Sequence, residues 1–347
     1  MERVRYLALT DIRKPRGIPF QEIDDVESLI RLLLYANEIQ IEGIILCTSC
    51  YKHAIREGEL RHVHRILKEY GRCLENLRRH ADGYPSEEEL HGKVKCGINA
   101  YGKSYGDGFG QEIYNDNEGV RHIINVLMEP DPSPLWIGLW GGANTLAQAL
   151  WTMERIMEPS EFANALKKLR IYGISDQDQA SIWMRETYGE QLFYIVSPSS
   201  GTAGGNSDGY SRATWPGISC DHFGHGSEDG VKKGGFSGAK DDLVSKRWLR
   251  EKIRKPGGLG SLYPLPVFCM EGDSPSFMGL IANGLNEPEH PEYGGWGGRY
   301  VWKGGIWTDH QDKVLGCDRR EHCSPQASYC GRTSLPLRCR SGEFCEF

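Results

Sequence analysis

Residues 4–47 read VRYLALTDIRKPRGIPFQEIDDVESLIRLLLYANEIQIEGIILC, and this stretch decides the fold. A mainly apolar run at Arg5–Leu9 predicts one strand, and Ile41–Cys47 predicts a second. Between them, the apolar residues of Val26–Ala36 recur at the spacing of an amphipathic helix. A strand, a helix and a strand in this order form a βαβ unit, whose two strands run parallel. The stretch therefore predicts the start of a parallel sheet.

The same alternation continues through the first half of the chain. The further predicted elements are helices at 59–78, 117–128, Asn144–Met157, Ser160–Lys168 and Gln179–Thr187, and strands at Leu135–Leu139, Leu169–Ile174 and Leu192–Val196. Strands that alternate with helices over such a length predict an α/β fold. We expect a doubly wound, mostly parallel sheet with helices on both faces.

The composition is that of an average soluble protein. Of 347 residues, 39% are hydrophobic and 25% are charged, which excludes a chain that is disordered throughout. The formal net charge of −6 provides no global positive field, so we expect no nucleic-acid partner. No apolar run is long enough for a membrane span, and the first strand begins too early for a signal peptide. These features predict no membrane partner and a cytoplasmic location.

The chain length permits one or two domains. We expect a single domain over residues 1–330. Residues 331–347 have neither strand nor helix periodicity, which predicts a loosely ordered tail. Within Ser197–Gly260, loops rich in glycine, serine and asparagine are expected at the carboxyl ends of the strands, where α/β proteins bind ligands. The alternative is that they are surface loops without a role.

Three aspartates flank the first strand and the first helix. Asp11 follows the strand, and Asp24 and Asp25 precede the helical periodicity, so the three carboxylates are expected at one edge of the sheet. Carboxylates held close together repel unless a cation lies among them, and Ca²⁺ takes such oxygen ligands. The alternative is that Asp24 and Asp25 cap the helix N-terminus and that Asp11 is an ordinary turn residue.

Several longer motifs resemble one known family. They are Thr10–Ile12, Asp24–Glu38, Trp140–Leu150, Ile174–Asp178, Tyr194–Gly201, Glu271–Phe277 and Glu289–Tyr300. With these motifs the chain resembles the nucleoside hydrolase-like domain family DUF1593, which is also labelled cellulose-binding and is related to inosine-uridine nucleoside hydrolases. The resemblance extends over residues 4–330 and implies a nucleoside hydrolase-like α/β architecture.

The resemblance also implies a calcium site and a catalytic base. Asp11 matches an aspartate that binds Ca²⁺ and accepts the proton of the attacking water. Asp25 and Asp273 match two further calcium ligands, and Asn144 falls where a backbone carbonyl joins them. Asp24 matches the residue that binds a ribose hydroxyl. Calcium would hold a sugar diol and acidify water, while the carboxylates oppose positive charge at the anomeric carbon.

Two further aspartates follow the strand predicted at Leu169–Ile174. Asp176 and Asp178 are expected at the same sheet edge, as candidates for a catalytic acid, here Asp176, and for binding substrate hydroxyls, here Asp178. Glu271, which belongs to one of the resembling motifs, and His290, within Glu-His-Pro-Glu, are further candidates for substrate binding.

Tryptophans next to glycines or in loops form another group of candidates. We expect Trp215 and Trp296 to bind substrate, because a planar ring stacks well on the apolar face of a sugar. The alternative is that such side chains pack in the core.

The chain departs from the family between Asp11 and Asp24. Twelve residues separate the two aspartates, more than in the family, and they include the cations Arg13, Lys14 and Arg16. These cations either compete with a metal for the carboxylates or lie on a loop that turns outward.

The leading hypothesis is a calcium-dependent, hydrolase-like enzyme that acts on a glycosidic or N-glycosidic bond. Its expected ligand is a small sugar, a nucleoside or a glycoside, and a homo-oligomer is a further possibility. The first alternative is a carbohydrate-binding protein without turnover. The second is a pathway enzyme that reuses the nucleoside hydrolase pocket for another substrate.

Overall fold

The structure is a computed structural model that describes residues 3–15, 23–196, 246–265, 271–298 and 300–308. Eight strands of the described residues form one sheet in the order β3-β2-β1-β4-β5-β6-β8-β7. Neighbouring strands run parallel except for β7 and β8. The strands are β1 (Val4–Thr10), β2 (Ile39–Leu46), β3 (Val94–Cys96), β4 (Leu135–Leu139), β5 (Leu169–Gly173), β6 (Phe193–Val196), β7 (Val301–Lys303) and β8 (Ile306–Thr308).

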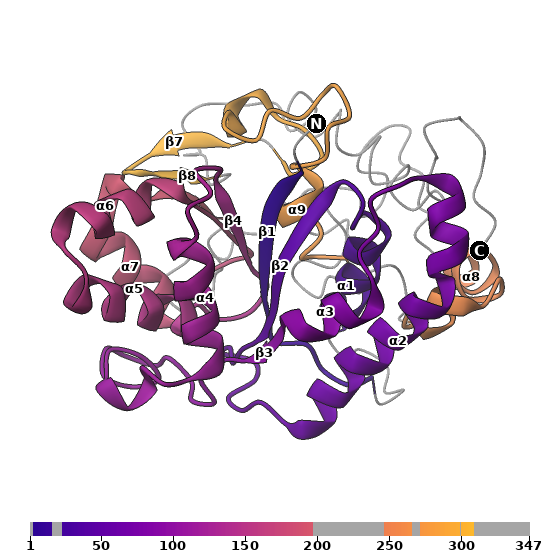
Figure 1. The fold of residues 1–347 in the computed structure, drawn as a ribbon, viewed down its shortest axis with the longest axis horizontal. Coiled ribbons are helices and arrows are strands. Elements are labelled where there is room, and N and C mark those ends of the chain that lie inside the picture. The colour runs from indigo at the N-terminus through magenta and orange to yellow at the C-terminus, as the bar shows by residue number, and fades with distance from the viewer. Residues whose placement is uncertain (1–2, 16–22, 197–245, 266–270, 299, 309–347) are drawn as a thin grey trace, which may run out of the picture.

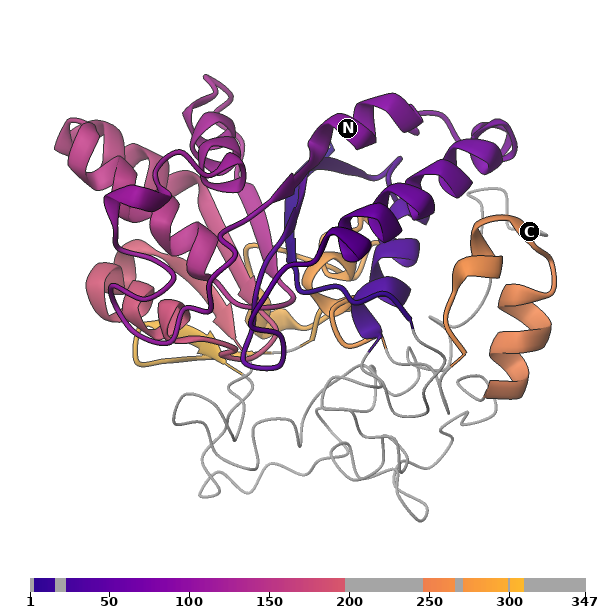
Figure 2. The same cartoon turned by 90° about the horizontal axis from the view of Figure 1, so that it is seen from below.

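Helices cover both faces of this sheet (Figures 1 and 2). Among the described residues, the α-helices of four or more residues are α1 (Asp24–Leu34), α2 (Glu57–His80), α3 (Glu87–Lys93), α4 (Glu118–Met128), α5 (Asn144–Ile156), α6 (Pro159–Lys168), α7 (Gln179–Tyr188) and α9 (Pro275–Met278). Alternate residues of β1 enter two separate cores: Tyr6 and Ala8 pack with α1 and α2, whereas Leu7 and Leu9 pack with α4 to α7. The predicted doubly wound α/β fold with a mostly parallel sheet is confirmed.

Most predicted elements are present with slightly shifted ends. The helix predicted at Val26–Ala36 is α1, which begins and ends earlier in the chain. Ile23 is the N-cap of α1 and no side chain caps this helix, so the interpretation of Asp24 and Asp25 as capping residues is wrong. The short elements α3, β3, β7 and β8 were not predicted, because a strand of three residues carries no periodicity.

Further sequence predictions concern the tail, the long loops and the lack of a membrane-spanning segment. The predicted tail at 331–347 and residues 197–245 of the predicted loop region, including Trp215, lie outside the described residues. The loop prediction is wrong for most of residues 246–260, which form α8 (Lys246–Trp248) and two further helical segments, Leu249–Arg254 and the start of Gly258–Leu262. Within the described part of the chain, no helix combines the length and the apolarity needed to cross a bilayer.

A buried ion pair fixes β1 against β2. Arg5 is 2% exposed, and its Nε donates to Glu42 at 2.6 Å, while Lys93 approaches the other oxygen of Glu42 at 3.0 Å. Burial alone would raise the pKa of Glu42, but the hydrogen bonds from Arg5 and Lys93 outweigh burial and lower it. Arg5 also pairs with the half-exposed Glu129. The pair therefore stabilises the folded state only while Glu42 is ionised.

Glu42→Gln should lower the free energy of unfolding by about 3 kcal/mol at pH 7, because it leaves Arg5 buried beside an uncharged partner. The folded pKa of Glu42 lies below its ordinary value of 4.5, so its contribution is present above that pH and lost below it. The difference between parent and variant in urea unfolding should shrink as the pH falls below 4.5. Glu129→Gln is the control, with an expected change under about 1 kcal/mol. Equal stability of parent and Glu42→Gln at pH 7 would contradict this account.

Candidate functional site

The carboxyl ends of the central strands meet at one edge of the sheet. The amide of Cys47, after β2, donates to the Thr10 carbonyl of β1 at 2.8 Å, and the amide of Trp140, after β4, donates to the Leu9 carbonyl at 2.8 Å. The amide of Ile174, after β5, donates to the last residue of β4 at 2.9 Å. The segments that follow β2, β4 and β5 are thus joined by backbone hydrogen bonds to the ends of β1 and β4, and the candidate aspartates lie on these segments or beside them.

Asp11 follows β1 and is 5% exposed. The Ser49 hydroxyl donates to its Oδ2 at 2.5 Å. Burial raises the pKa of Asp11, and the hydrogen bond from Ser49 and the charges of Lys52 and Arg13 oppose that shift. A Cβ on Gly141 would lie 2.8 Å from Oδ1, so a glycine is needed where this turn passes the carboxylate. Asp11 is thus a fixed carboxyl group with a raised proton affinity.

Three other carboxylates converge beside Asp11. Asp24 and Asp25 lie in the first turn of α1, Asp273 lies just before α9, and one oxygen of each lies within 4.8 Å of the others. Their exposures are 6%, 5% and 1%. The hydroxyl of Thr10, the residue before Asp11, donates to Asp25. Buried carboxylates this close require compensating positive charge, and their hard oxygen atoms are ligands that Ca²⁺ or another hard divalent cation prefers.

The described residues therefore fit a metal in a way that differs partly from the predicted ligand set. Asp25 and Asp273 belong to the converging group, as predicted, and Asp24 joins them. Asp11 is not a member of this group among the described acidic residues. Asn144 begins α5, where its side chain donates to the Ala100 carbonyl at 2.6 Å. The role of its own carbonyl as a ligand stays a prediction.

A group of largely buried polar side chains, Arg31, Glu271, Tyr263 and Glu27, holds the segment around Asp273 against α1; we call this group the latch. Arg31, on α1, pairs with Glu271 through two hydrogen bonds, and Glu271 is 1% exposed. The Tyr263 hydroxyl lies 2.6 Å from Glu271 and 3.0 Å from Glu27 on α1. Glu271, predicted to bind substrate, thus has an ion-pair partner, and its position fixes the backbone two residues before Asp273.

A second set of contacts fixes the other side of Asp273. The Ser276 hydroxyl donates to the Asp273 carbonyl at 2.6 Å and lies 2.8 Å from the Tyr6 hydroxyl on β1. The indole of Trp140 donates to Ser276 at 2.9 Å. Ser274 lies 3.2 Å from Ser28 of α1. Asp273 is consequently positioned by both α1 and the sheet.

Asp176 and Asp178 have defined partners. Both oxygens of Asp176 accept hydrogen bonds from Arg185, each at 2.7 Å, which favours the ionised carboxylate. Asp178 is the N-cap of α7 and accepts from the amides of Ser181 at 3.2 Å and Asn144 at 3.0 Å. Burial, opposed by the backbone hydrogen bonds, raises the pKa of Asp178 to about 7. Asp178 therefore links the N-termini of α5 and α7 at the sheet edge.

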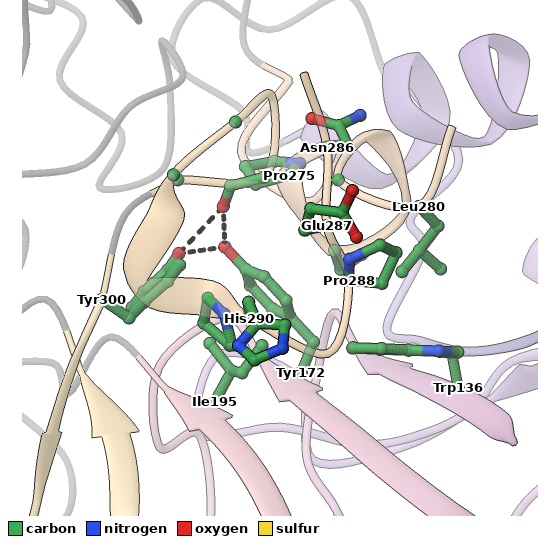
Figure 3. A pocket seen from close by; sticks show the side chains of 17 residues that line it. Trp136, Tyr172, Ile195, Pro275, Leu280, Asn286, Glu287, Pro288, His290 and Tyr300 are labelled. Carbon is green, nitrogen blue, oxygen red and sulfur yellow. Dashed lines mark hydrogen bonds between the residues drawn. The ribbon is translucent and has the colours of Figure 1, made fainter. Parts of the chain in front are cut away.

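His290 lies in a different place, a pocket on the sheet face that also carries α1 (Figure 3). The cavity has a volume of about 40 Å³, and Trp136, Tyr172 and Tyr300 are among its lining residues. Nδ1 of His290 donates a hydrogen bond to Glu292 at 3.0 Å, and the ring stacks on an exposed tyrosine. The pocket has room for ordered water or a small group, and a role of His290 in substrate binding stays a prediction.

Trp296 is next to this pocket, between two of its lining glycines, Gly295 and Gly297. It is half-buried and packs against the core on that face of the sheet. Its amide donates to Asn286 at 2.8 Å. For this tryptophan the structure supports the core-packing alternative to sugar stacking.

Sequence reasoning missed the groups that hold the candidate carboxylates. Ser49 contacts Asp11, Arg31 contacts Glu271, and Arg185 contacts Asp176. Ser49 follows the predicted strand Ile41–Cys47, so its position at a strand end was an available signal. The two arginines carried no such signal, because each lies in the middle of an ordinary helical pattern.

The fold and this acidic edge define a class: a doubly wound α/β protein with carboxylates gathered where its parallel strands end. The family described as "Cellulose-binding Sde182, nucleoside hydrolase-like domain" matches residues 5–300, and the chain belongs to this family.

Two solved structures are similar to the chain. One is a nucleoside hydrolase-related hypothetical protein from Saccharophagus degradans that is associated with carbohydrate metabolism. It is 29% identical, with a TM-score of 0.67, and the match covers 94% of this chain and 64% of that one, so this chain spans less than two thirds of that protein. The other, the effector protein XOO4466, is 10% identical over 96% of this chain and 94% of its own, with a TM-score of 0.39 that supports no argument. None of the curated proteins matches the chain.

Measurements of the free energy of unfolding can test whether the latch stabilises the segment around Asp273. Arg31→Met should lower the free energy of unfolding by about 3–5 kcal/mol, because it leaves Glu271 buried without its counter-charge. Adding Glu271→Gln to that variant should recover part of the loss, since the uncompensated charge is then removed. Arg247→Ala, in an exposed pair with Glu251, is the control and should cost under about 1 kcal/mol. Chemical unfolding measures all four proteins, and an Arg31→Met variant as stable as the parent would refute the latch.

Proposed function

We propose that the chain is a calcium-dependent hydrolase that acts on a glycosidic or N-glycosidic bond of a small sugar, nucleoside or glycoside. The observation that carries the proposal is the buried group of Asp24, Asp25 and Asp273, in which Asp25 accepts a hydrogen bond from Thr10, the residue before Asp11. Membership of a nucleoside hydrolase-like family supports the same reading. A binding site for sugar hydroxyls and a nearby base are the two elements that such a reaction needs.

In this proposal Asp24, Asp25 and Asp273 hold the cation. Each contributes one oxygen to the converging group, and Ca²⁺ accepts six to eight oxygen ligands in flexible geometry, more than Mg²⁺ tolerates. When bound, the ion supplies positive charge that orients a sugar diol and lowers the pKa of water. A carboxylate has two oxygen atoms, so Asp24 can contribute one to the ion and accept a hydrogen bond from a sugar hydroxyl with the other. Its predicted role in substrate binding is therefore compatible with metal binding.

Asp11 is the proposed general base. Its carboxylate is oriented by Ser49, and its raised pKa gives it a greater affinity for a proton than an exposed aspartate has. Its carboxylate would also oppose positive charge that develops at the anomeric carbon. The backbone of Gly141 passes close to Asp11, so a side chain at position 141 would displace the carboxylate from its position.

The second candidate function is carbohydrate binding without turnover. It is favoured by the surroundings of the predicted catalytic acid: Asp176 accepts two hydrogen bonds from Arg185, which favours the ionised carboxylate over a proton donor. The family description, cellulose-binding, agrees with this candidate as well. Hydrolysis by this chain therefore requires either a leaving group that departs without being protonated or a different residue that donates the proton.

The metal proposal predicts that calorimetric titration of Ca²⁺ into chelator-treated protein gives saturable binding. Asp273→Asn should weaken this binding by at least about tenfold, because it removes a charged ligand from the group. Asp116→Asn is the matched control, since Asp116 is 96% exposed and lies on the surface, and it should bind Ca²⁺ like the parent. No heat from the parent, with an unchanged melting temperature in Ca²⁺, would eliminate the site.

The catalytic proposal predicts that Asp11→Asn keeps the fold and the calcium affinity but lowers kcat by about 10²–10⁴-fold, because it removes the proton acceptor. Release of sugar from nucleosides, aryl glycosides and oligosaccharides is the measurement. A variant that hydrolyses as fast as the parent would exclude Asp11 as the base. A parent that binds one of these ligands and hydrolyses none of them would establish the binding function instead.

A further inference from the structure

Helices α2 and α3 lie side by side at the β3 end of the sheet (Figure 1) and bring two histidines together. Nδ1 of His64, on α2, lies 2.7 Å from Nδ1 of His91, on α3. The ring centroids are 4.9 Å apart, with an angle of 31° between the planes. The His91 side chain is 30% exposed, so the pair is accessible from solvent. None of these groups contributes to the acidic edge.

Glu87 orients one member of the pair. Its Oε1 lies 3.3 Å from Nε2 of His91, one helical turn along α3. If Nε2 donates its proton to this carboxylate, Nδ1 of His91 carries a lone pair directed at His64. A histidine that binds a metal usually donates its other ring nitrogen to a carboxylate in this way, which fixes the ring and raises its basicity.

Gly71 makes this arrangement fit between the helices. A Cβ at Gly71 would lie 1.9 Å from Oε2 of Glu87, so any larger residue on α2 would displace the carboxylate from His91. Glycine inside a helix costs about 1 kcal/mol relative to alanine. The close approach of Glu87 gives a physical reason for glycine in the interior of α2.

His64 is held in the neutral form that metals bind. Burial lowers the pKa of His64, and the nearby His91 and Lys95 lower it further. Two imidazoles whose nitrogens share a hydrogen bond cannot both be protonated without repulsion. Near pH 7 the gap between the two rings therefore contains one shared proton rather than two.

We propose that His64 and His91 bind a divalent transition-metal ion, Zn²⁺, Ni²⁺ or Cu²⁺, through their Nδ1 atoms, with Glu87 orienting His91. The shared proton leaves Nδ1 of His64 and that ring takes up a proton at Nε2, so both rings bind the ion as neutral imidazoles and no net proton is released. Imidazole suits these ions, whereas Ca²⁺ prefers carboxylate and carbonyl oxygen, so the site is distinct from the acidic edge. Water completes the coordination.

The distance between the two Nδ1 atoms is already close to the distance between two ligands of one zinc ion. Zinc–nitrogen bonds of about 2.0–2.1 Å at a tetrahedral angle place two ligand nitrogens about 3.3 Å apart, so the rings need to separate by only about 0.6 Å. Because the two histidines come from different helices, binding would also join α2 to α3. The bound ion should therefore raise the melting temperature of the folded protein.

Titration calorimetry of Zn²⁺ into calcium-saturated protein tests the proposal. We expect His64→Gln and His91→Gln each to weaken one zinc-binding event by more than about tenfold, and Glu87→Ala to weaken it by about 10–100-fold. His80→Gln, on the exposed end of α2, and Asp273→Asn, at the acidic edge, should bind Zn²⁺ like the parent. Isotherms of His64→Gln and His91→Gln that match the parent would overturn the proposal.

If a histidine variant fails to fold, an NMR spectrum of the parent protein still tests the proposed zinc site. In long-range proton–nitrogen NMR spectra of the histidine rings, Zn²⁺ should shift the Nδ1 signals of two of the eleven histidines to metal-bound positions. Zinc that shifts no pair of Nδ1 signals, or shifts only Nε2 signals, would overturn the site even if heat is observed.

Discussion

The structure depends on the placement of three buried carboxylates within 4.8 Å of one another. Two unit charges at that separation repel by at least about 3 kcal/mol at an effective dielectric constant of about 20. The positive end of α1, at which Asp24 and Asp25 lie, and the Thr10 hydroxyl offset part of this repulsion. A divalent cation at a bonding distance of about 2.4 Å attracts each carboxylate several times more strongly than the carboxylates repel each other. Cation binding is therefore the simplest reason for assembling this group.

The fold supplies the two halves of the group from distant parts of the chain. Asp24 and Asp25 come from the first βαβ unit, and Asp273 comes from the segment before α9. The Arg31–Glu271 pair joins that segment to α1, and Ser276 joins it to Tyr6 in the central strand. The same sheet places Asp11 next to Thr10, so the proposed base and the proposed metal ligands share one rigid support. Metal binding, positioning of the base and stability of the latch are thus physically linked.

The sequence predicted the fold well, because the alternation of β1, α1 and β2 depends on local periodicity. It also indicated Asp25 and Asp273 as members of one group, although for Asp273 the indication came from the family resemblance. The residue pattern also placed Asp24 with Asp25, but it included Asp11 in the same group, and only the side-chain directions in the folded chain show that Asp11 is not a member. The partners Arg31 and Arg185 were missed for the same reason. His64 and His91 belong to no spacing motif, and only the packing of α2 on α3 brings them together.

The central claim is that Asp24, Asp25 and Asp273 form a cation site. Crystals grown in Ca²⁺ and in Mn²⁺, whose anomalous signal identifies the ion, provide the most direct test. The account predicts one strong anomalous peak in the Mn²⁺ crystals, and one density peak in the Ca²⁺ crystals, about 2.1–2.6 Å from an oxygen of each of the three aspartates. Saturating ion with no peak among these oxygens, or with a positively charged side chain between them, would contradict it.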